Sequence, residues 1–210
     1  MKNTIALCLV ATMAFSVGQL AGAENAEAVK VAKEGAQAAR NQDWDKAITL
    51  FRRATELDRK NAPNLAAVLQ QRAVAYFGEQ KFDMAVSDLN DALKLTPNDP
   101  ILYERRAYIE MQVRDLDKAL ADYSEAIKLQ PNEFRYYQTR SYIYEVKGDI
   151  KNSMADTDKM LKLQPKNPEA LARKQRLQTI MQSQAAAQPP SGPLQAPPPS
   201  QPPPAPGKTP

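Results

Sequence analysis

Three stretches of this chain are versions of one pattern and decide its fold: RAVAYFGEQKFDMAVSDLNDALKLTP at 72–97, RAYIEMQVRDLDKALADYSEAIKLQP at 106–131 and RSYIYEVKGDIKNSMADTDKMLKLQP at 140–165. Each stretch begins with an arginine, ends with a proline and follows the previous one at a constant step of 34 in the numbering. A period of this size is typical of stacked repeats, in which one unit is too small to bury its own apolar face. Such proteins usually present a surface for binding rather than a catalytic centre.

Within each block the apolar residues follow a helical spacing and fit two helices. Asp99 is placed to cap a first helix that has Pro100 at its first position, and Asp115 is placed to cap a second. Pro131 ends the second helix, because proline cannot continue the backbone hydrogen bonds. In the next block, Gly148 follows the first helix, where a left-handed residue is favoured. The sequence therefore predicts an all-α array of helix pairs.

The last helix of the array is expected to act as a cap. Asn167 and Pro168 open it, and Leu171, Leu177 and Met181 are predicted to lie on one side. The remaining surface is polar and is expected to meet water, and it includes Arg173, Lys174, Gln175, Arg176 and Gln178. A terminal repeat needs such a polar outer face.

The first block is offset from the others. Ala47 aligns with Ala85 at a step of 38, so four extra residues, about one helical turn, lie near 59–64. We expect them to lengthen a helix or a loop without rotating the apolar stripe. The predicted repeat domain is 24–183, with repeats at about 28–62, 66–99, 100–133 and 134–167 and a cap at 168–183.

The segment 1–23 has the features of a secretory signal peptide. Lys2 precedes an apolar run over 5–17, and Ala21-Gly22-Ala23 forms an A-x-A cleavage site. Cleavage after Ala23 removes Cys8, the single cysteine, so the mature chain would hold no disulfide and no thiolate metal site. We predict export to a bacterial periplasm, and the alternatives are secretion or an uncleaved anchor. A location close to the membrane stays open.

Residues 184–210 are predicted to form a proline-rich tail that is disordered or polyproline II, because 11 of the 17 prolines fall between 189 and 210. The segment 203–206 with Lys208 resembles an SH3-type ligand. Such matches arise freely in proline-rich sequence, and a spacer or solubilising tail is the preferred interpretation.

Composition argues against several classes of function. The chain has no histidine, which removes the usual general base and the commonest metal ligand. No glycine-rich phosphate loop is present, and the 28 basic and 24 acidic residues are interspersed rather than gathered into a nucleic-acid stripe. We therefore expect no enzyme, no cofactor or metal, no small-molecule substrate and no nucleic acid partner.

The repeated positions resemble the tetratricopeptide repeat family. Its pattern of bulky, small, aromatic and proline positions is met in the second block by Leu69, Ala73, Tyr76, Ala85, Leu89, Ala92 and Pro97. Departures occur at Glu110, Thr157 and Met160, and the resemblance covers roughly 26–182. It implies a right-handed superhelical solenoid of about four helix-turn-helix repeats plus a C-terminal capping helix. In this family the first helix of each pair, helix A, lines a concave groove.

The resemblance also implies which residues form a partner-binding groove: Val74, Phe77, Glu104, Tyr108, Met111, Arg135, Gln138, Tyr142 and Glu145. Val74, Tyr108 and Tyr142 are 34 apart and would form an apolar and aromatic strip. The alternative, that these aromatic side chains pack against neighbouring helices, stays open. One subtype of the family grips a partner's C-terminal carboxylate with lysine and asparagine, which are absent here from the corresponding positions. The expected ligand is therefore an extended or helical protein segment bound by burial of its side chains.

The most regular polar feature is an Arg–Asp pattern, formed by Arg72, Arg106 and Arg140 on helix A and by Asp88, Asp122 and Asp156 on helix B. The first block has neither residue, since Glu34 and Leu50 stand in their places. Having both or neither indicates that the two are partners. We predict a partly buried ladder that fixes helix packing; a solvated face and direct ligand contact are the alternatives.

These features together predict a non-catalytic protein-interaction adaptor of the cell envelope that binds a partner peptide or helix in its groove. The alternative is a self-assembling structural subunit of an envelope complex. The sequence names neither the partner nor the oligomeric state.

Overall fold

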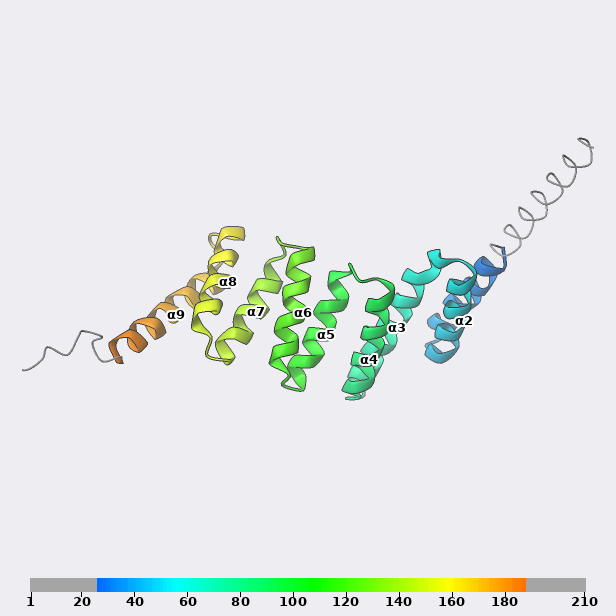
Figure 1. Ribbon diagram of the computed structural model, residues 1–210, viewed down its shortest axis with the longest axis horizontal. Coiled ribbons are helices and arrows are strands. Elements are labelled where there is room, and N and C mark those ends of the chain that lie inside the picture. Colours follow the sequence, from blue (N-terminus) through cyan, green and yellow to red (C-terminus); the bar gives the residue numbers. More distant parts are fainter. Residues whose placement is uncertain (1–25, 188–210) are drawn as a thin grey trace, which may run out of the picture.

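The computed structural model describes residues 26–187, and over that range the chain is an elongated row of helices joined by short turns (Figure 1). A helix over residues 26–40 is followed by α2 (Trp44–Leu57), the 3-10 turn η1 (Arg59–Asn61), α3 (Ala62–Gly78), α4 (Phe82–Leu95), α5 (Pro100–Gln112), α6 (Leu116–Leu129), α7 (Phe134–Val146), α8 (Ile150–Leu163) and α9 (Pro168–Ala187). This range contains no strand, and the predicted all-α solenoid of helix pairs is confirmed. The predicted signal peptide (1–23) and residues 188–210 of the predicted tail lie outside the described residues.

Each helix packs on its neighbour in the chain. The closest pairs are α3 with α4, α5 with α6 and α7 with α8, and each second helix also contacts the first helix of the next pair. We call α3, α5, α7 and α9 the A helices and α2, α4, α6 and α8 the B helices. The helix over residues 26–40 is the A helix of the first pair.

Small residues permit this close packing. Ala85, Ala92, Ala119 and Ala126 on the B helices have no exposed surface. A larger side chain at any of them would push two helices apart, because protein interiors are already filled at crystal-like density. The alanine positions of the repeat are therefore contact points between helices.

The helix starts follow the predicted caps. The Asp99 side chain accepts a hydrogen bond from the backbone N–H of Ile101, and the Asp115 side chain accepts one from Lys118. Asn167 caps α9 by accepting from the N–H of Ala170 at 3.0 Å. Each cap satisfies a backbone donor that the helix itself leaves without a partner.

The exits from the A helices are left-handed in every pair. Gly148 has φ 75°, as predicted, and the corresponding Gln42, Gln80 and Arg114 have φ between 60° and 62°. These three left-handed residues were not predicted from the sequence, because glycine is the usual marker of this conformation.

The four extra residues of the first block lengthen α3. This helix has 17 residues, whereas α5 and α7 have 13 each. It begins at Ala62, four residues before the predicted start of the second repeat at 66, and Pro63 fits in its first turn. At the other end, α9 continues to Ala187 rather than stopping at 183, because residues 185–187 are alanines, the strongest helix formers.

The buried stripe of α9 differs from the prediction. Leu171 and Met181 are 48% and 44% exposed, while Ala170 and Leu177 are fully buried. Arg173, which was expected to meet water, is only 8% exposed. The prediction was right for Leu177 and wrong for Leu171 and Met181, because α9 packs through Ala170, Arg173 and Leu177, which also share one helical face.

Candidate functional site

An arginine on each of α3, α5 and α7 forms a two-pronged hydrogen bond with an aspartate on the following B helix. Arg106 Nε donates to Asp122 Oδ2 at 2.7 Å, and Arg106 Nη2 donates to Asp122 Oδ1 at 2.6 Å. The corresponding distances are 2.8 and 2.7 Å for Arg72 and Asp88, and 2.8 Å twice for Arg140 and Asp156. The structure thus brings together the members of each pair proposed from the sequence.

These pairs are largely withdrawn from water. The three aspartates are 4–5% exposed, and the arginine side chains are 17–21% exposed. The hydrogen bond to Asp122 raises the pKa of Arg106 above its ordinary value. Such burial does not fit a solvated face, and the paired geometry leaves the aspartate oxygens already bonded.

The third arm of each arginine crosses to the preceding B helix. Arg106 Nη1 donates to Asn90 Oδ1 at 2.6 Å, and Arg140 Nη1 donates to Ser124 Oγ at 3.0 Å. One repeat later, Lys174 on α9 takes the place of Arg140, and it donates at 2.7 Å to Asp158, which takes the place of Ser124. The ladder therefore links consecutive repeats, and it continues into α9 with a lysine that the arginine pattern had not revealed.

The predicted strip on the A helices is half open to solvent. Val74, Tyr108 and Tyr142 are each 49% exposed. The ring of Tyr108 also packs against that of Phe77 on α3, with centroids 5.5 Å apart. Tyr108 therefore packs against a neighbouring helix with part of its ring and presents the rest to water.

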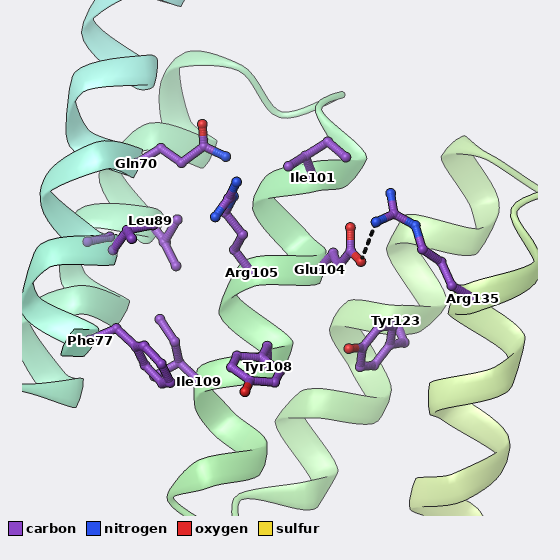
Figure 2. A pocket seen from close by; sticks show the side chains of 12 residues that line it. Gln70, Phe77, Leu89, Ile101, Glu104, Arg105, Tyr108, Ile109, Tyr123 and Arg135 are labelled. Carbon is purple, nitrogen blue, oxygen red and sulfur yellow. Dashed lines mark ion pairs between the residues drawn. The ribbon is translucent and has the colours of Figure 1, made fainter. Parts of the chain in front are cut away.

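A pocket of about 480 Å³ opens beside this strip, between α3 and α5 (Figure 2). Five of the nine predicted groove residues line it: Val74, Phe77, Glu104, Tyr108 and Arg135. Leu89 and Tyr123 reach it from the B helices, and Gln70, Ile101 and Arg105 complete its upper part in Figure 2. The pocket combines an apolar and aromatic wall with charged groups at one side.

Of the charged residues around the pocket, Glu104 and Arg135 form an ion pair that does not include Arg105. Arg135 Nη1 lies 3.1 Å from Glu104 Oε1, and burial raises the pKa of the Glu104 carboxyl. Burial also raises the pKa of Tyr123 to about 12, so that its hydroxyl stays neutral. Arg105, which was not among the predicted groove residues, forms no ion pair with any other residue of 26–187.

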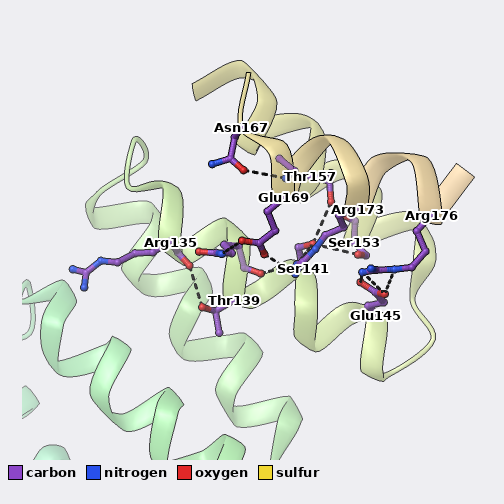
Figure 3. A network of polar contacts seen from close by, with 12 residues as sticks. Arg135, Thr139, Ser141, Glu145, Ser153, Thr157, Asn167, Glu169, Arg173 and Arg176 are labelled. Carbon is purple, nitrogen blue, oxygen red and sulfur yellow. Dashed lines mark hydrogen bonds and ion pairs between the residues drawn. The ribbon is translucent and has the colours of Figure 1, made fainter. Parts of the chain in front are cut away.

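The remaining predicted groove residues lie outside the pocket. Met111 packs on the cluster around Tyr123 and Ile143. Gln138 donates to Glu169 Oε2 at 2.6 Å, and Glu145 accepts two bonds from Arg176 at 2.9 and 3.0 Å (Figure 3). Since Glu169 and Arg176 belong to α9, this helix covers the predicted groove on α7 next to the exposed Tyr142.

Arg173 anchors α9 in a buried cluster of hydroxyls (Figure 3). Its Nη1 donates to the Gln138 carbonyl and to Ser141 Oγ, both at 2.9 Å. Ser141 Oγ lies 3.3 Å from Ser153 Oγ and 3.2 Å from Thr157 Oγ1. The departure from the repeat pattern at Thr157 is thus explained, because the fourth repeat meets α9 through hydrogen bonds.

Glu110 departs from the pattern in another way. It occupies the position of Tyr76 and Tyr144, yet it is almost fully buried and its Oε2 has no hydrogen-bond partner among the described residues. Burial, together with the nearby Asp122 carboxylate, raises its pKa to about 7. It is the buried acid with the clearest energetic cost.

No group of three or more His, Cys, Asp or Glu side chains in residues 26–187 is arranged to hold a metal ion. None of the helices in this range has the length and apolarity that a membrane crossing requires.

A family model for the tetratricopeptide repeat matches residues 32–100 and 71–134. The matched segments belong to the tetratricopeptide repeat family. The helix pair α7–α8 and the helix α9 continue the row of helices with the same step of 34, as Arg106, Arg140 and Lys174 show. A search of curated proteins gave no match to the chain.

Solved structures show the same tetratricopeptide fold. The crystal structure of MamA protein matches with a TM-score of 0.55 and 15% identity, over 76% of this chain and 86% of that one. The first tetratricopeptide domain of human RPAP3 matches with a TM-score of 0.51 and 22% identity, over 60% of this chain and 99% of that one. The first tetratricopeptide domain of Spaghetti (RPAP3) was solved bound to the HSP90 peptide SRMEEVD. It matches with a TM-score of 0.50 and 22% identity, over 56% of this chain and 93% of that one. At these identities the likeness concerns the fold alone.

Proposed function

We propose that this protein is a non-catalytic interaction adaptor that binds a segment of a partner protein along its A helices, centred on the α3–α5 pocket. The observation that carries the proposal is the pocket itself, in which Phe77, Tyr108 and Val74 offer apolar surface to solvent. Exposed apolar surface beside polar groups is characteristic of sites that bind proteins or peptides.

The fold supports this use. In the Spaghetti (RPAP3) structure, a tetratricopeptide domain of similar fold is bound to a peptide. The present chain has Gln70, Glu104 and Gln138 where the carboxylate-gripping subtype has its polar clamp residues. Burial of partner side chains, rather than capture of a chain end, would therefore provide most of the affinity.

We place this activity in the bacterial cell envelope, on the basis of the apolar run at 5–17 and the site after Ala23. The intact mass of the protein recovered from a periplasmic fraction tests this placement. A mature chain that begins at Glu24 supports export, whereas a cytosolic protein that retains Met1 or Lys2 contradicts it.

The binding site is tested by photo-crosslinking in cells. A photoreactive phenylalanine analogue at position 108 should give a defined protein adduct that mass spectrometry identifies. The same analogue at Lys128, exposed on a B helix, is the matched control. Adducts of equal yield from both positions, or none from position 108, would argue against the groove.

Self-assembly into an envelope structure is the second candidate, because α9 exposes Leu171 and Met181 at the end of the array. A solution mass that rises with protein concentration, and falls to the monomer value in Leu171→Gln, would favour it. A monomer at all concentrations favours the adaptor.

A further inference from the structure

Three junctions of this array correspond residue by residue, because they are related by the step of 34. At each, a B-helix residue precedes an A-helix residue by 16 positions: Leu89 and Arg105, Tyr123 and Thr139, Thr157 and Arg173. Since the backbone follows the same plan at each junction, differences between them come from these side chains.

Two of the junctions are filled by the chain itself. Between α5, α6 and α7, the ring of Tyr123 is buried and lies 6.5 Å from that of Tyr136. Between α7, α8 and α9, Thr157 is small, and the buried Arg173 reaches in and donates to Ser141. An aromatic ring thus occupies the first of these places, and a buried guanidinium occupies the second.

The third junction, between α3, α4 and α5, is not closed. Leu89 is smaller than the tyrosine at the corresponding position, and Arg105 is exposed rather than buried. Most residues that line the pocket of about 480 Å³ belong to α3, α4 and α5, while Tyr123 and Arg135 extend its lining toward α7. Figure 2 shows Arg105 extending from α5 toward Gln70 and Leu89. The smaller Leu89 and the exposed Arg105 therefore leave space at this junction that a ring or a buried guanidinium occupies at the other two.

The comparison also shows what Arg105 lacks. Arg173 bonds to Ser141 and, four residues earlier on its own helix, to Glu169 at 3.2 Å. Two repeats earlier, the positions of these two partners hold Ala73 and Ile101, which cannot accept a hydrogen bond from Arg105 through their side chains. The neighbouring Glu104 is held by Arg135 at 3.1 Å. Arg105 therefore points into the pocket without the hydroxyl and carboxylate acceptors that Arg173 has. The remaining partner of Arg173, the Gln138 carbonyl, corresponds to the carbonyl of Gln70.

We infer that this pocket recognises an internal partner segment in which an aromatic side chain stands beside an aspartate or glutamate. The inference rests on the proposed binding function and specifies its ligand. The ring occupies the apolar part against Phe77 and Tyr108, as tilted aromatic contacts allow. The carboxylate accepts the paired N–H groups of Arg105, a geometry that favours arginine over lysine.

The test uses the full chain and random dodecapeptides displayed on phage. The wild-type protein should enrich peptides with an aromatic residue within two positions of an acid. A selected peptide is then synthesised with acetylated and amidated ends, so that only side-chain carboxylates remain, and its affinity is measured by fluorescence anisotropy. Arg105→Gln should weaken binding about tenfold, whereas Arg52→Gln, which removes the same charge from the exposed surface of α2, should leave it unchanged.

A double-mutant cycle ties the carboxylate to Arg105. Replacing the peptide's acid by its amide should lower its affinity for the wild-type protein about tenfold. The same replacement should change its affinity for Arg105→Gln little. Ile101→Glu gives Arg105 an acid four residues earlier on its helix, as Glu169 does for Arg173. This variant should also bind the acidic peptide with lower affinity. Circular dichroism checks that each variant remains folded.

The outcomes separate this inference from the function on which it rests. If the selected peptides bind through Tyr108 but have no aromatic–acidic pair, or if the two effects in the cycle simply add, the ligand assignment fails while the binding function stands. If amidation of the peptide's end abolishes binding, the site reads a chain terminus, and the assignment also fails. If no enriched peptide loses affinity on Tyr108→Ala, the proposed binding function itself fails.

Discussion

Arg106 on α5 and Asp122 on α6 are joined by two parallel hydrogen bonds of 2.7 and 2.6 Å, and a third arm of the same guanidinium reaches Asn90 on α4. One side chain thus connects its own helix pair to the preceding one. In a stacked array, stability is the sum of each repeat and its interfaces, so a residue that contributes to both is expected to have a large effect.

Replacing Arg106 by alanine should lower the free energy of unfolding by about 3 kcal/mol, because it leaves the buried Asp122 carboxylate without its cation. Urea denaturation followed by circular dichroism measures the loss. Arg53→Ala is the matched control: this arginine is about half exposed and lies 3.5 Å from Glu27, so about 0.5 kcal/mol or less is expected. A stable Arg106→Ala protein that no longer binds its partner would instead show that Arg106 contacts the ligand.

The double variant Arg106→Met with Asp122→Leu tests the reason for that loss. It removes both charges and keeps most of the volume, and buried ion pairs can often be replaced in this way at little cost. We expect it to be more stable than Arg106→Ala. Equal destabilisation would indicate that the pair itself, rather than an isolated buried charge, decides the stability.

The periodic features of this molecule were accessible from the sequence because they are local to one repeat. Arg106 and Asp122 are separated by a step of 16 in the numbering, and the same step recurs in the next repeat at Arg140 and Asp156. A pattern that recurs with the helix pairs predicts both the pairs and the partners. The caps at Asp99 and Asp115 were predictable for the same reason, since they depend only on the next few residues.

The arrangement of α9 was not accessible in this way. The spacing of Leu171, Leu177 and Met181 is as helical as that of Ala170, Arg173 and Leu177, so periodicity alone does not choose between them. The choice depends on the hydroxyl of Ser141, which accepts a hydrogen bond from Arg173 in the following repeat. Buried polar groups are selected by partners that are distant in the chain.

The pocket depends on a comparison between repeats. Leu89 is an acceptable residue for its position in the family pattern. That it leaves space becomes evident only when it is compared with the tyrosine at the corresponding position of the next junction. Arg105 was likewise overlooked, since it lies between the predicted groove positions Glu104 and Tyr108. A comparison of Arg105 with Arg173, its counterpart two repeats later, was the one signal in the sequence that could have indicated it.

Glu110 should make the stability of the protein depend on pH. Its pKa is raised to about 7 in the folded chain from 4.5, so the folded protein keeps a proton that the unfolded chain releases. Stability should therefore fall as the pH rises from about 4.5 to 7, by about 2–3 kcal/mol in total. Urea titrations at about pH 5 and pH 8 measure the change.

Glu110→Gln is the control for that pH dependence, because it has nearly the same shape and cannot ionise. It should reduce the difference between the two pH values and should be more stable than wild type at the higher one. If wild type and Glu110→Gln lose the same stability between the two pH values, another group is responsible.

Gly148 should be more sensitive to substitution than Gly78. Gly148 has φ 75°, where any Cβ is strained, and alanine there should cost about 1 kcal/mol. Gly78 lies in α3, and a Cβ added there would meet nothing within 4 Å, so alanine at this position should stabilise the protein by about 0.5 kcal/mol. Thermal unfolding of both variants measures the contrast, and equal effects would contradict it.

Arg173→Met should release α9 without unfolding the middle of the array. The methionine keeps an apolar stem, but Ser141 and the Gln138 carbonyl lose the donor that lies 2.9 Å from each. Loss of buried hydrogen bonds to a charged group costs about 2 kcal/mol, and the cost falls mainly on α9 because each repeat contacts only its neighbours. Hydrogen exchange measured by mass spectrometry should show faster exchange in 168–187 and unchanged exchange in 100–129. Arg176→Met, which removes an exposed pair with Glu145, should change either segment little, and equal acceleration in both variants would mean that the buried hydroxyl cluster does not hold α9.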